Sequence, residues 1–452
     1  MAPPNVLWLL TDEQRRDSLG FYGSPWAHSP NLDRIAAEGV VFTNALTQAP
    51  LCAPGRCSMV TGRYVTEHGV WSNIHENLPY GDHLTYGFRD AGYPTVSVGK
   101  SHYCTRNSAF DVEGLGKVTT DHVHYFEYAS QYNEADYDVV KYPGQPYPWI
   151  FGGRFPAPAE ETAEARCIEA AEGWLEEHDR ERPFFLRVSL NAPHTPVVPP
   201  EPFDTIVDPE AIHLPPEAEA NAPGEPDWIR HHLRRAADAD IMSPEQIGKM
   251  RRYYYGWCAH VDHQIGRLLD WMRERGLLEN TIIALSSDHG TQLGDFGLVQ
   301  KQTLFEPTAC VPFLFWYPGH VAEGARVTTP VETRQLLPTL LELAGLSAPD
   351  DRAALSLAPY LRSGQEPPVR PCFSEFVLEW PEYCGHADPI VMVRESDLKL
   401  SLCFGPEPYD GWLVNLAVDP FERRNLYGDA RYAVDCTWLE QLVVEHYAQR
   451  RQ

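Results

Sequence analysis

The chain has few basic residues, no long apolar run and no tandem repeat. Among its 452 residues, 37 lysines and arginines stand against 63 aspartates and glutamates, a formal net charge of −26. This balance argues against a general binder of nucleic acid or of an anionic membrane surface, because both attract basic proteins. It leaves an anionic substrate possible, since the local field at a site can oppose the global sign. No apolar segment approaches the roughly 20 residues that cross a bilayer.

Paired cysteine spacings are also absent, and the ten cysteines include no Cys-x-x-Cys. Residues 1–4 are not a basic leader, and the apolar segment Asn5–Leu10 is too short for a signal core. We therefore expect a cytoplasmic protein with mostly buried free thiols. The length and the 43% hydrophobic content suit a large globular domain accompanied by a smaller one. The oligomeric state stays open, and a homo-oligomer is possible.

Short apolar runs alternate with longer helical patterns, which predicts an α/β fold with a large, mostly parallel central sheet flanked by helices. The expected strands are Asn5–Leu10, Thr95–Val98, Phe184–Leu190, Thr281–Leu285 and Val311–Trp316. The expected helices are Asn31–Glu38, Glu160–Glu177, Pro244–Arg275 and Thr333–Ala344. The segments 107–155 and 196–239 are predicted to be irregular excursions that shape access to a site.

The pattern changes after about residue 363. Shorter strand-like segments follow, and the chain ends in a helical pattern. These are Pro389–Val393, Lys399–Cys403, Gly411–Leu416 and the helix Ala433–Ala448. We therefore divide the chain into a catalytic domain, 1–363, and a smaller α+β subdomain, 364–452.

Four of the five predicted sheet strands end in ionisable side chains. The strand ends carry Asp12, the Lys100-Ser101-His102 segment, His194 and the Asp288-His289 pair. Open α/β sheets bind ligands beyond the carboxyl ends of their strands, so these groups are expected to share one polar site.

The segment Cys52-Ala53-Pro54-Gly55-Arg56 reads as the start of a short helix. Pro54 suits the first turn, where its missing N–H costs nothing, and Gly62 is a plausible end. Cys52 would then lie at the helix N-terminus, where free N–H groups and the dipole favour an anion. This is a suitable place for a nucleophile that meets a negatively charged group.

Together these motifs resemble the type I sulfatases of the alkaline-phosphatase-like superfamily, over most of the chain. The resemblance rests on an ordered set: Asp12, Cys-x-Pro-x-Arg at 52–56, Thr61-Gly62-Arg63, Gly99–His102, Pro193-His194, Asp288-His289-Gly290, Lys301 and Asp419–Leu426. It implies an alkaline-phosphatase-like fold and a hydrolase that cleaves sulfate monoesters. One departure is Gly55, which stands where the family usually has serine or alanine.

The resemblance implies that Cys52 is converted to formylglycine, an aldehyde, by a maturation enzyme. The hydrated aldehyde is the nucleophile. Its second hydroxyl allows sulfate to leave as the aldehyde re-forms, which splits one difficult step into two.

The resemblance also implies a divalent metal. A hard cation prefers oxygen ligands, so Asp12 and Asp288 are the first candidates, with His289, position 52 and Glu13 beside them. Glu13 stands where many sulfatases carry a second aspartate. Calcium is the commonest ion of the family, and the nitrogen ligand His289 also makes manganese possible.

Further roles follow from matched motif positions. Lys100 and Lys301 are expected to hold sulfate oxygens, and Arg56 to support the aldehyde hydrate. His102 is the expected base, and His194, with Lys301, the expected acid for the departing alcohol. Asn73 is the expected additional contact to sulfate. Residues proposed to line the leaving-group pocket are His75, Tyr103, Glu382, Tyr383 and His386.

Two other functions remain open. A phosphonate monoester or phosphodiester hydrolase can use the same scaffold and the same Asp-His-Gly segment, although such relatives tend to lack the Lys-x-His pair at Lys100 and His102. A non-catalytic relative with an unmodified Cys52 is the second alternative. The histidine pairs His122/His124 and His260/His263 are interpreted as structural rather than as metal sites.

Overall fold

A computed structural model describes residues 2–73, 83–102, 109–116, 137–141, 150–214, 226, 228–229, 241–353, 355–377, 389–404 and 409–450. Of the residues named above, His75, Tyr103, His122, His124, Glu382, Tyr383 and His386 lie outside these ranges.

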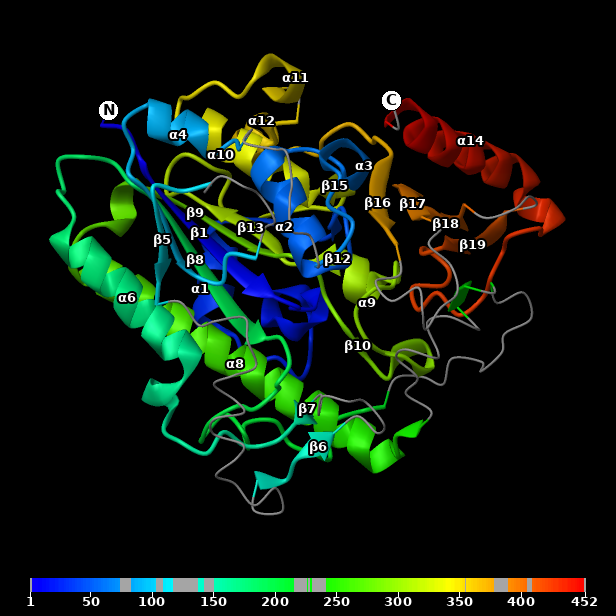
Figure 1. Ribbon diagram of the computed structural model, residues 1–452, viewed down its shortest axis with the longest axis horizontal. Coiled ribbons are helices and arrows are strands. Elements are labelled where there is room, and N and C mark those ends of the chain that lie inside the picture. Colours follow the sequence, from blue (N-terminus) through cyan, green and yellow to red (C-terminus); the bar gives the residue numbers. More distant parts are fainter. Residues whose placement is uncertain are drawn as a thin grey trace.

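The centre of the molecule is an eight-stranded sheet in the order β14-β2-β13-β9-β1-β8-β4-β5 (Figure 1). The strands are β1 (Asn5–Asp12), β2 (Val40–Phe42), β4 (Thr95–Gly99), β5 (Val112–Leu115), β8 (Phe185–Pro193), β9 (Thr281–Ser287), β13 (Phe313–Trp316) and β14 (Ala325–Val327). From β9 to β5 all neighbours are parallel, whereas β13 runs antiparallel to both β9 and β2. The prediction of a large, mostly parallel sheet is confirmed.

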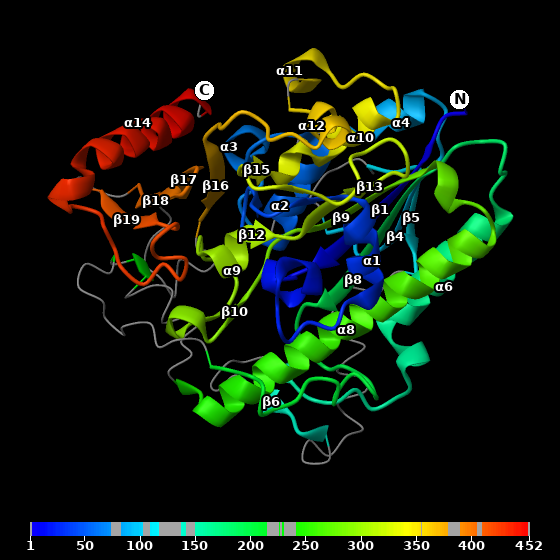
Figure 2. The same cartoon turned by 180° about the vertical axis from the view of Figure 1, so that it is seen from behind.

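Strand β1 is apolar without interruption because both faces of the sheet are covered. Leu7 and Leu9 pack into a core with α6 (Ala163–Glu177) and α8 (Pro244–Glu274), on the side best seen in Figure 2. Val6, Trp8 and Leu10 face the opposite core, which contains α10 (Leu336–Leu343) and α12 (Ala358–Ser363). Alternate residues of one strand thus serve two hydrophobic layers.

The remaining helices are short except at the C-terminus. They are α1 (Pro30–Glu38), α2 (Cys52–Thr61), α3 (Val65–His68), α4 (Tyr86–Asp90), α9 (Glu306–Ala309), α11 (Asp350–Ala353) and α14 (Ala433–Arg450). The small strands outside the main sheet are β3 (Ala45–Leu46), β6 (Val140–Lys141), β7 (Ile150–Gly152), β10 (Gln292–Leu293), β11 (Val299–Gln300), β12 (Cys310–Val311) and β15 (Val331–Glu332). Helix α2 begins at Cys52 as predicted, and Gly62 ends it in the left-handed conformation (φ 70°) that glycine favours.

The C-terminal part contains a four-stranded antiparallel sheet: β16 (Cys372–Phe376), β17 (Ile390–Glu395), β18 (Leu398–Cys403) and β19 (Asp410–Asn415). One face packs under α14 through Leu439 and Val443. The other face joins a core with Leu298, Leu304 and Phe305, which flank Lys301 in sequence. The subdomain therefore supports the segment that carries this lysine, while the chain division at 363/364 stays a prediction.

Sequence patterns missed some of these elements. Strand β13 is shorter than predicted because Cys310 and Val311 pair with β3 instead of joining the central sheet. Edge strands β2 and β14 have only three residues each, too few for a clear periodicity. Within the described ranges, no helix has both the length and the apolar character that crossing a membrane requires.

Candidate active site

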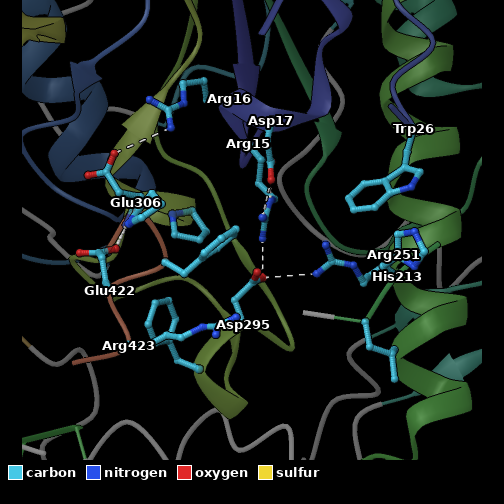
Figure 3. Close-up of a pocket in the computed structure, with 15 residues that line it drawn as sticks. Arg15, Arg16, Asp17, Trp26, His213, Arg251, Asp295, Glu306, Glu422 and Arg423 are labelled. Carbon is cyan, nitrogen blue, oxygen red and sulfur yellow. Dashed lines mark hydrogen bonds and ion pairs between the residues drawn. The ribbon is translucent and has the colours of Figure 1, made fainter. Parts of the chain in front are cut away.

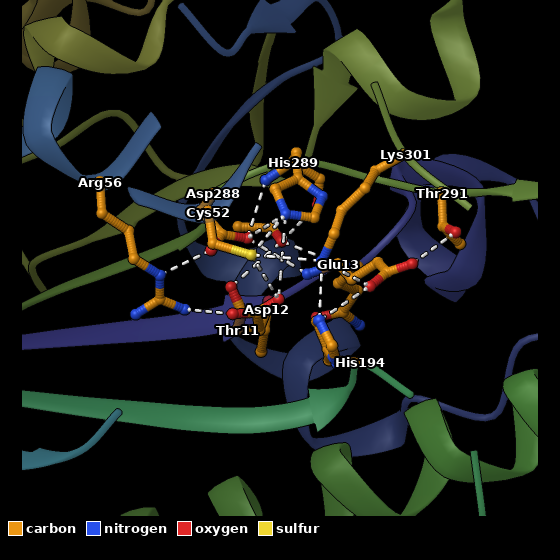
Figure 4. Close-up of polar contacts among 12 residues, drawn as sticks. Thr11, Asp12, Glu13, Cys52, Arg56, His194, Asp288, His289, Thr291 and Lys301 are labelled. Atoms are coloured by element: carbon orange, nitrogen blue, oxygen red, sulfur yellow. Dashed lines mark hydrogen bonds and ion pairs between the residues drawn. The ribbon is translucent and has the colours of Figure 1, made fainter. Parts of the chain in front are cut away.

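Four adjacent strands bring their polar ends to one edge of the sheet. In the order β9, β1, β8 and β4, the ends carry Asp288, Asp12, His194 and Lys100. Parallel neighbours deliver their carboxyl ends to the same side, which is why residues almost 300 positions apart meet. Figure 4 shows the resulting cluster around Cys52.

Cys52 lies at the first position of α2 and is buried, with 1% of its surface exposed. Its Sγ is 3.2 Å from His289 Nε2 and 3.7 Å from Asp12 Oδ1. Lys301 Nζ donates to the same sulfur at 3.3 Å. Asp12, His289 and Lys301, three of the residues named from sequence, thus lie against Cys52.

Arg56 links the two buried aspartates from the side away from the sulfur. Its Nη2 donates to Asp12 Oδ2 at 2.9 Å and its Nε to Asp288 Oδ2 at 2.6 Å. Its Nη1 donates to Ser189 Oγ at 2.8 Å and to the Lys100 carbonyl at 3.2 Å. Two of these four contacts orient the carboxylates, and the other two hold the guanidinium in place; none of the four is made to Cys52.

The second oxygen of each carboxylate faces the cluster. Ligand atoms from Asp12, Cys52, Asp288 and His289 all lie within 4.8 Å of one another. His289 Nδ1 donates to the Gly290 carbonyl at 2.8 Å, so Nε2 is the nitrogen on which a cation in this cluster would replace a proton. Two carboxylates and one imidazole suit a divalent cation, so the donor chemistry fits the expected metal.

The electrostatics of the buried cluster also favour a cation between the aspartates. Burial raises the pKa of Asp288, and the neighbouring Asp12 adds to the rise against the opposing effect of Arg56. The pKa of Asp12 lies below its ordinary value although burial raises it, because Lys100 and other cations oppose that rise. Lys100 Nζ forms an ion pair with Asp12 Oδ2. Asp288 has less compensation, and a bound cation would supply it.

Position 52 favours negative charge. Burial by itself raises the pKa of the Cys52 thiol, but Lys301 and Lys100 lower it well below its ordinary value. Burial lowers the pKa of His289, yet Asp288 and Cys52 raise it to about 9 overall. These shifts describe a site in which cations surround the side chain of residue 52.

Lys301, His194 and Glu13 form a second polar group beside the first. Lys301 Nζ is 2.7 Å from His194 Nε2 and 3.3 Å from Glu13 Oε2. Glu13 also accepts a 2.7 Å hydrogen bond from Thr291 Oγ1. The site residues named from sequence thus lie together, although the carboxylate of Glu13 points toward Lys301 rather than toward His289 (Figure 4).

Asn73 lies at the start of α2, where its Oδ1 accepts a hydrogen bond from the Ala53 amide at 2.9 Å. It therefore supports the first turn of the helix beside position 52. Histidines 260 and 263 lie on α8, where His260 is buried and contacts Thr162 at 3.0 Å. His260 thus occupies a structural position, as the sequence interpretation proposed.

Sequence reasoning missed Thr291, Ser189 and Thr47. Thr47 Oγ1 donates to the Asp288 carbonyl at 2.6 Å, and Ser189 receives Arg56. A lone hydroxyl carries no sequence signal of its own. The only indication was position, since Thr291 follows the Asp288-His289-Gly290 segment by one residue.

A pocket of about 480 Å³ lies close to Thr291 and Glu13 (Figure 3). Its wall includes Arg15, whose Nη1 pairs with Asp295, and Arg251, whose Nη1 lies 3.6 Å from the same carboxylate. Arg15 Nη1 also donates to the Thr291 carbonyl at 3.2 Å. Thr291 therefore connects the pocket wall, through its carbonyl, with Glu13, through its hydroxyl.

Comparison with known families decides the identity. Residues 4–346 match the sulfatase family, and residues 294–449 match the family described as N-sulphoglucosamine sulphohydrolase, C-terminal. The chain belongs to the sulfatase family. The sulfatase match alone covers more than half of the chain and contains every site residue described above.

Individual relatives agree with this assignment. The sulfatase chain is 27% identical to the arylsulfatase of Clostridium perfringens (strain 13 / Type A), over 99% of this chain and 95% of that protein. It is 30% identical to the choline-sulfatase of Rhizobium meliloti (strain 1021), over 96% of this chain and 84% of that protein.

Solved structures confirm the fold. The phosphonate monoester hydrolase of Agrobacterium radiobacter superposes with a TM-score of 0.83 at 23% identity, covering 99% of this sulfatase and 96% of that chain. A protein in complex with its substrate D-glucosamine-2-N,6-O-disulfate gives 0.79 at 23% identity, with coverages of 99% and 98%. At this level of identity the two structures establish the architecture alone.

Proposed function

We propose that this sulfatase cleaves sulfate monoesters through a formylglycine derived from Cys52 and a divalent metal. The observation that carries the proposal is the convergence of Asp12, Asp288 and His289 on the buried residue 52, with lysines beside it. In the structure, Cys52 Sγ marks the position that the oxygens of the hydrated aldehyde would take.

The residues of the site indicate where the cation and the formylglycine would lie. Asp12, Asp288, His289 and residue 52 would hold the cation, calcium or manganese, which would supply Lewis-acid stabilisation of the sulfuryl oxygens. Formylglycine would supply the geminal diol, with one hydroxyl as nucleophile and the other to let sulfate depart. Arg56 holds the outer oxygens of both aspartates and so fixes the ligand geometry.

The chain's own cations then act on the substrate. Lys100 and Lys301 would bind sulfate oxygens. Lys301 Nζ lies 3.3 Å from Cys52 Sγ, and Lys100 Nζ pairs with Asp12, which is itself next to that sulfur. His102, which follows β4 in the segment that carries Lys100, would accept a proton from the hydroxyl of residue 52. His194 and Lys301 would return a proton to the alcohol, and their mutual contact at 2.7 Å supports this role. Asn73 supports the helix start that carries residue 52.

Mass spectrometry of the peptide that contains residue 52 tests the modification. Co-expression with a formylglycine-generating enzyme should lower the mass of this peptide, because the thiol becomes an aldehyde. Cys57→Ser is the matched control, since Cys57 lies in the same helix and should not affect conversion. An unmodified peptide together with full esterase activity would refute the formylglycine route, and an unmodified, inactive protein would support the non-catalytic alternative.

Substrate class is tested with a panel of esters on the matured protein. Relatives include proteins named arylsulfatase, choline-sulfatase and N-acetylglucosamine-6-O-sulfatase, so the panel should contain an aryl sulfate, choline sulfate and a 6-sulfated sugar. Phenyl phosphonate belongs beside them because phosphonate monoester hydrolases share the fold. Lys100 and His102 favour sulfate, and a dominant phosphonate activity would reverse the order of the two functions.

Three further expectations stay predictions. The maturation enzyme is the expected protein partner, and gel filtration tests for a homo-oligomer. Fractionation of native cells tests the cytoplasmic location. Limited proteolysis near residue 363 tests the division between the domains 1–363 and 364–452.

A further inference from the structure

The carboxylate of Glu13 is fully engaged away from the principal cluster of metal donors. Its Oε1 accepts from Thr291 Oγ1 at 2.7 Å, and its Oε2 lies 3.3 Å from Lys301 Nζ and 3.5 Å from His194 Nε2. Glu13 is 2% exposed, so water does not compete for these oxygens. To coordinate a cation held by Asp288 and His289, the Glu13 carboxylate would have to give up these contacts.

Glu13 reaches that cluster by its backbone instead. Its amide donates to Asp288 Oδ1 at 3.1 Å, in an unusual backbone conformation with a φ of 66°. This positive φ costs energy for a residue with a side chain, and it persists only where surrounding contacts over-determine it. The amide helps to orient Asp288, and the side chain is directed to a different group.

Lys301 has three ammonium hydrogens and three described acceptors for them. These are Cys52 Sγ at 3.3 Å, Glu13 Oε2 at 3.3 Å and His194 Nε2 at 2.7 Å. One hydrogen thus faces the reacting position, one faces the imidazole and one is held by the carboxylate. Loss of the carboxylate would free the ammonium to rotate and would remove the carboxylate with which it pairs at 3.3 Å.

His194 depends on the same arrangement. Its Nδ1 lies 2.6 Å from the Thr195 carbonyl, so this nitrogen carries a proton and donates it. Nε2 of the neutral ring is therefore the acceptor for Lys301. Asp12, Glu13 and His194 could geometrically hold an ion, but the Lys301 ammonium already lies against two of the three.

The anchor of Glu13 is itself fixed. The Thr291 amide donates to the Pro307 carbonyl at 3.0 Å, and the Thr291 carbonyl accepts from Arg15 at 3.2 Å. The hydroxyl that holds Glu13 Oε1 thus projects from a backbone restrained on both sides. Side-chain positions supported in this way retain their geometry during a reaction.

We propose that Glu13 is a positioning residue for the Lys301–His194 pair that protonates the departing alcohol, and that its carboxylate is not a metal ligand. This inference rests on the proposed function of the site. It predicts that loss of the Glu13 carboxylate harms esters that need a proton on the leaving oxygen, and spares metal affinity.

Glu13→Ala, Glu13→Gln and Thr291→Val test the proposal in the matured protein. Calorimetric titration with Mn²⁺ alone measures metal affinity, with Asp12→Asn as the control that should lose it. The values of kcat/KM for 4-nitrophenyl sulfate and for an unactivated alkyl sulfate measure dependence on the leaving group. General acids typically contribute about 10²–10⁴-fold, and an aryl leaving group needs little of this.

We expect Glu13→Ala to lower kcat/KM for the alkyl ester at least about 10-fold more than for the aryl ester. Its Mn²⁺ affinity should stay within about 2-fold of wild type, since a lost ligand would cost far more. Glu13→Gln and Thr291→Val should show the same selectivity with smaller losses, because each retains part of the anchor. These two milder variants keep the test valid if Glu13→Ala does not fold.

Two results would overturn the proposal. A 10-fold or greater loss of Mn²⁺ affinity in Glu13→Gln would show that the carboxylate contributes to metal binding, directly or through a ligand, and would contradict the proposal. Equal losses for both esters in all three variants would remove its connection with the leaving group. A wild-type protein that cleaves neither ester would instead refute the proposed function, and the Mn²⁺ titration would still decide whether Glu13 binds the ion.

Discussion

Removal of Arg56 should destabilise the metal-free protein more than any surface charge change. Arg56, Asp12 and Asp288 are all fully buried, and the guanidinium donates to both carboxylates, at 2.9 and 2.6 Å. In Arg56→Met the Lys100 ammonium still faces Asp12, whereas Asp288 loses its hydrogen-bonded cation. Breaking a buried ion pair by removing one partner costs about 3–5 kcal/mol. We expect a loss of this size in the free energy of unfolding.

Urea unfolding in the presence of a chelator measures this loss. Arg34→Met is the matched control, because Arg34 pairs with Asp270 at 3.1 Å while both side chains are about half exposed. Exposed pairs contribute roughly 0–1 kcal/mol. Added Ca²⁺ or Mn²⁺ should restore part of the loss in Arg56→Met, since bound cation stabilises the folded state by about 2.7 kcal/mol at 100 times its Kd. If Arg56→Met loses no more than Arg34→Met, the assignment of Arg56 as the support of the aspartates is wrong.

Three further changes have defined outcomes. Burial raises the pKa of the Glu164 carboxyl from 4.5 to about 7, so its ionisation costs stability as the pH rises through this interval. Glu164→Gln should therefore gain roughly 2–3 kcal/mol over wild type near pH 8 and almost nothing near pH 4, and a gain independent of pH in urea unfolding would contradict this. Gly55→Ala would place a Cβ 2.9 Å from the Asp288 carbonyl, so it should cost about 1–3 kcal/mol and weaken metal binding, as thermal unfolding and Mn²⁺ titration can check. Lys399→Met should destabilise the protein by about 3–5 kcal/mol in chemical unfolding, because Lys399 pairs with buried Glu422 at 2.8 Å; an unchanged midpoint would argue against it.

Part of the site was accessible from sequence because its residues follow strands that are easy to detect, and the roles of Cys52, Arg56 and Lys301 came from the family resemblance. β1, β4, β8 and β9 are buried on both faces and appear as continuous apolar runs, so the residues at their ends stood out. The short strands β2 and β14 gave no such signal. The hydroxyl groups of Thr291 and Thr47 were also invisible, since their importance lies in the carboxylate or carbonyl that they contact.

The sequence also could not predict the direction in which a side chain points. Residue type and position made Glu13 a candidate ligand, but its positive φ and its contacts with Thr291 and Lys301 depend on a loop almost 300 residues away. Arg56 was expected to support the aldehyde hydrate, and its bonds to both aspartates are contacts that the sequence did not indicate. Neither orientation follows from local spacing.

The amino-acid sequence alone determined the class of fold, the helix that begins at Cys52 and the set of charged groups that surround it. The fold class and the strand-end groups follow from the periodicity of consecutive residues, whereas Arg56, Lys301 and Glu13 were named through the family resemblance. Only the tertiary structure decided which carboxylates face a cation and which face Lys301. The reason is physical: buried charges are stable only beside a particular partner, and folding, not spacing along the chain, chooses that partner.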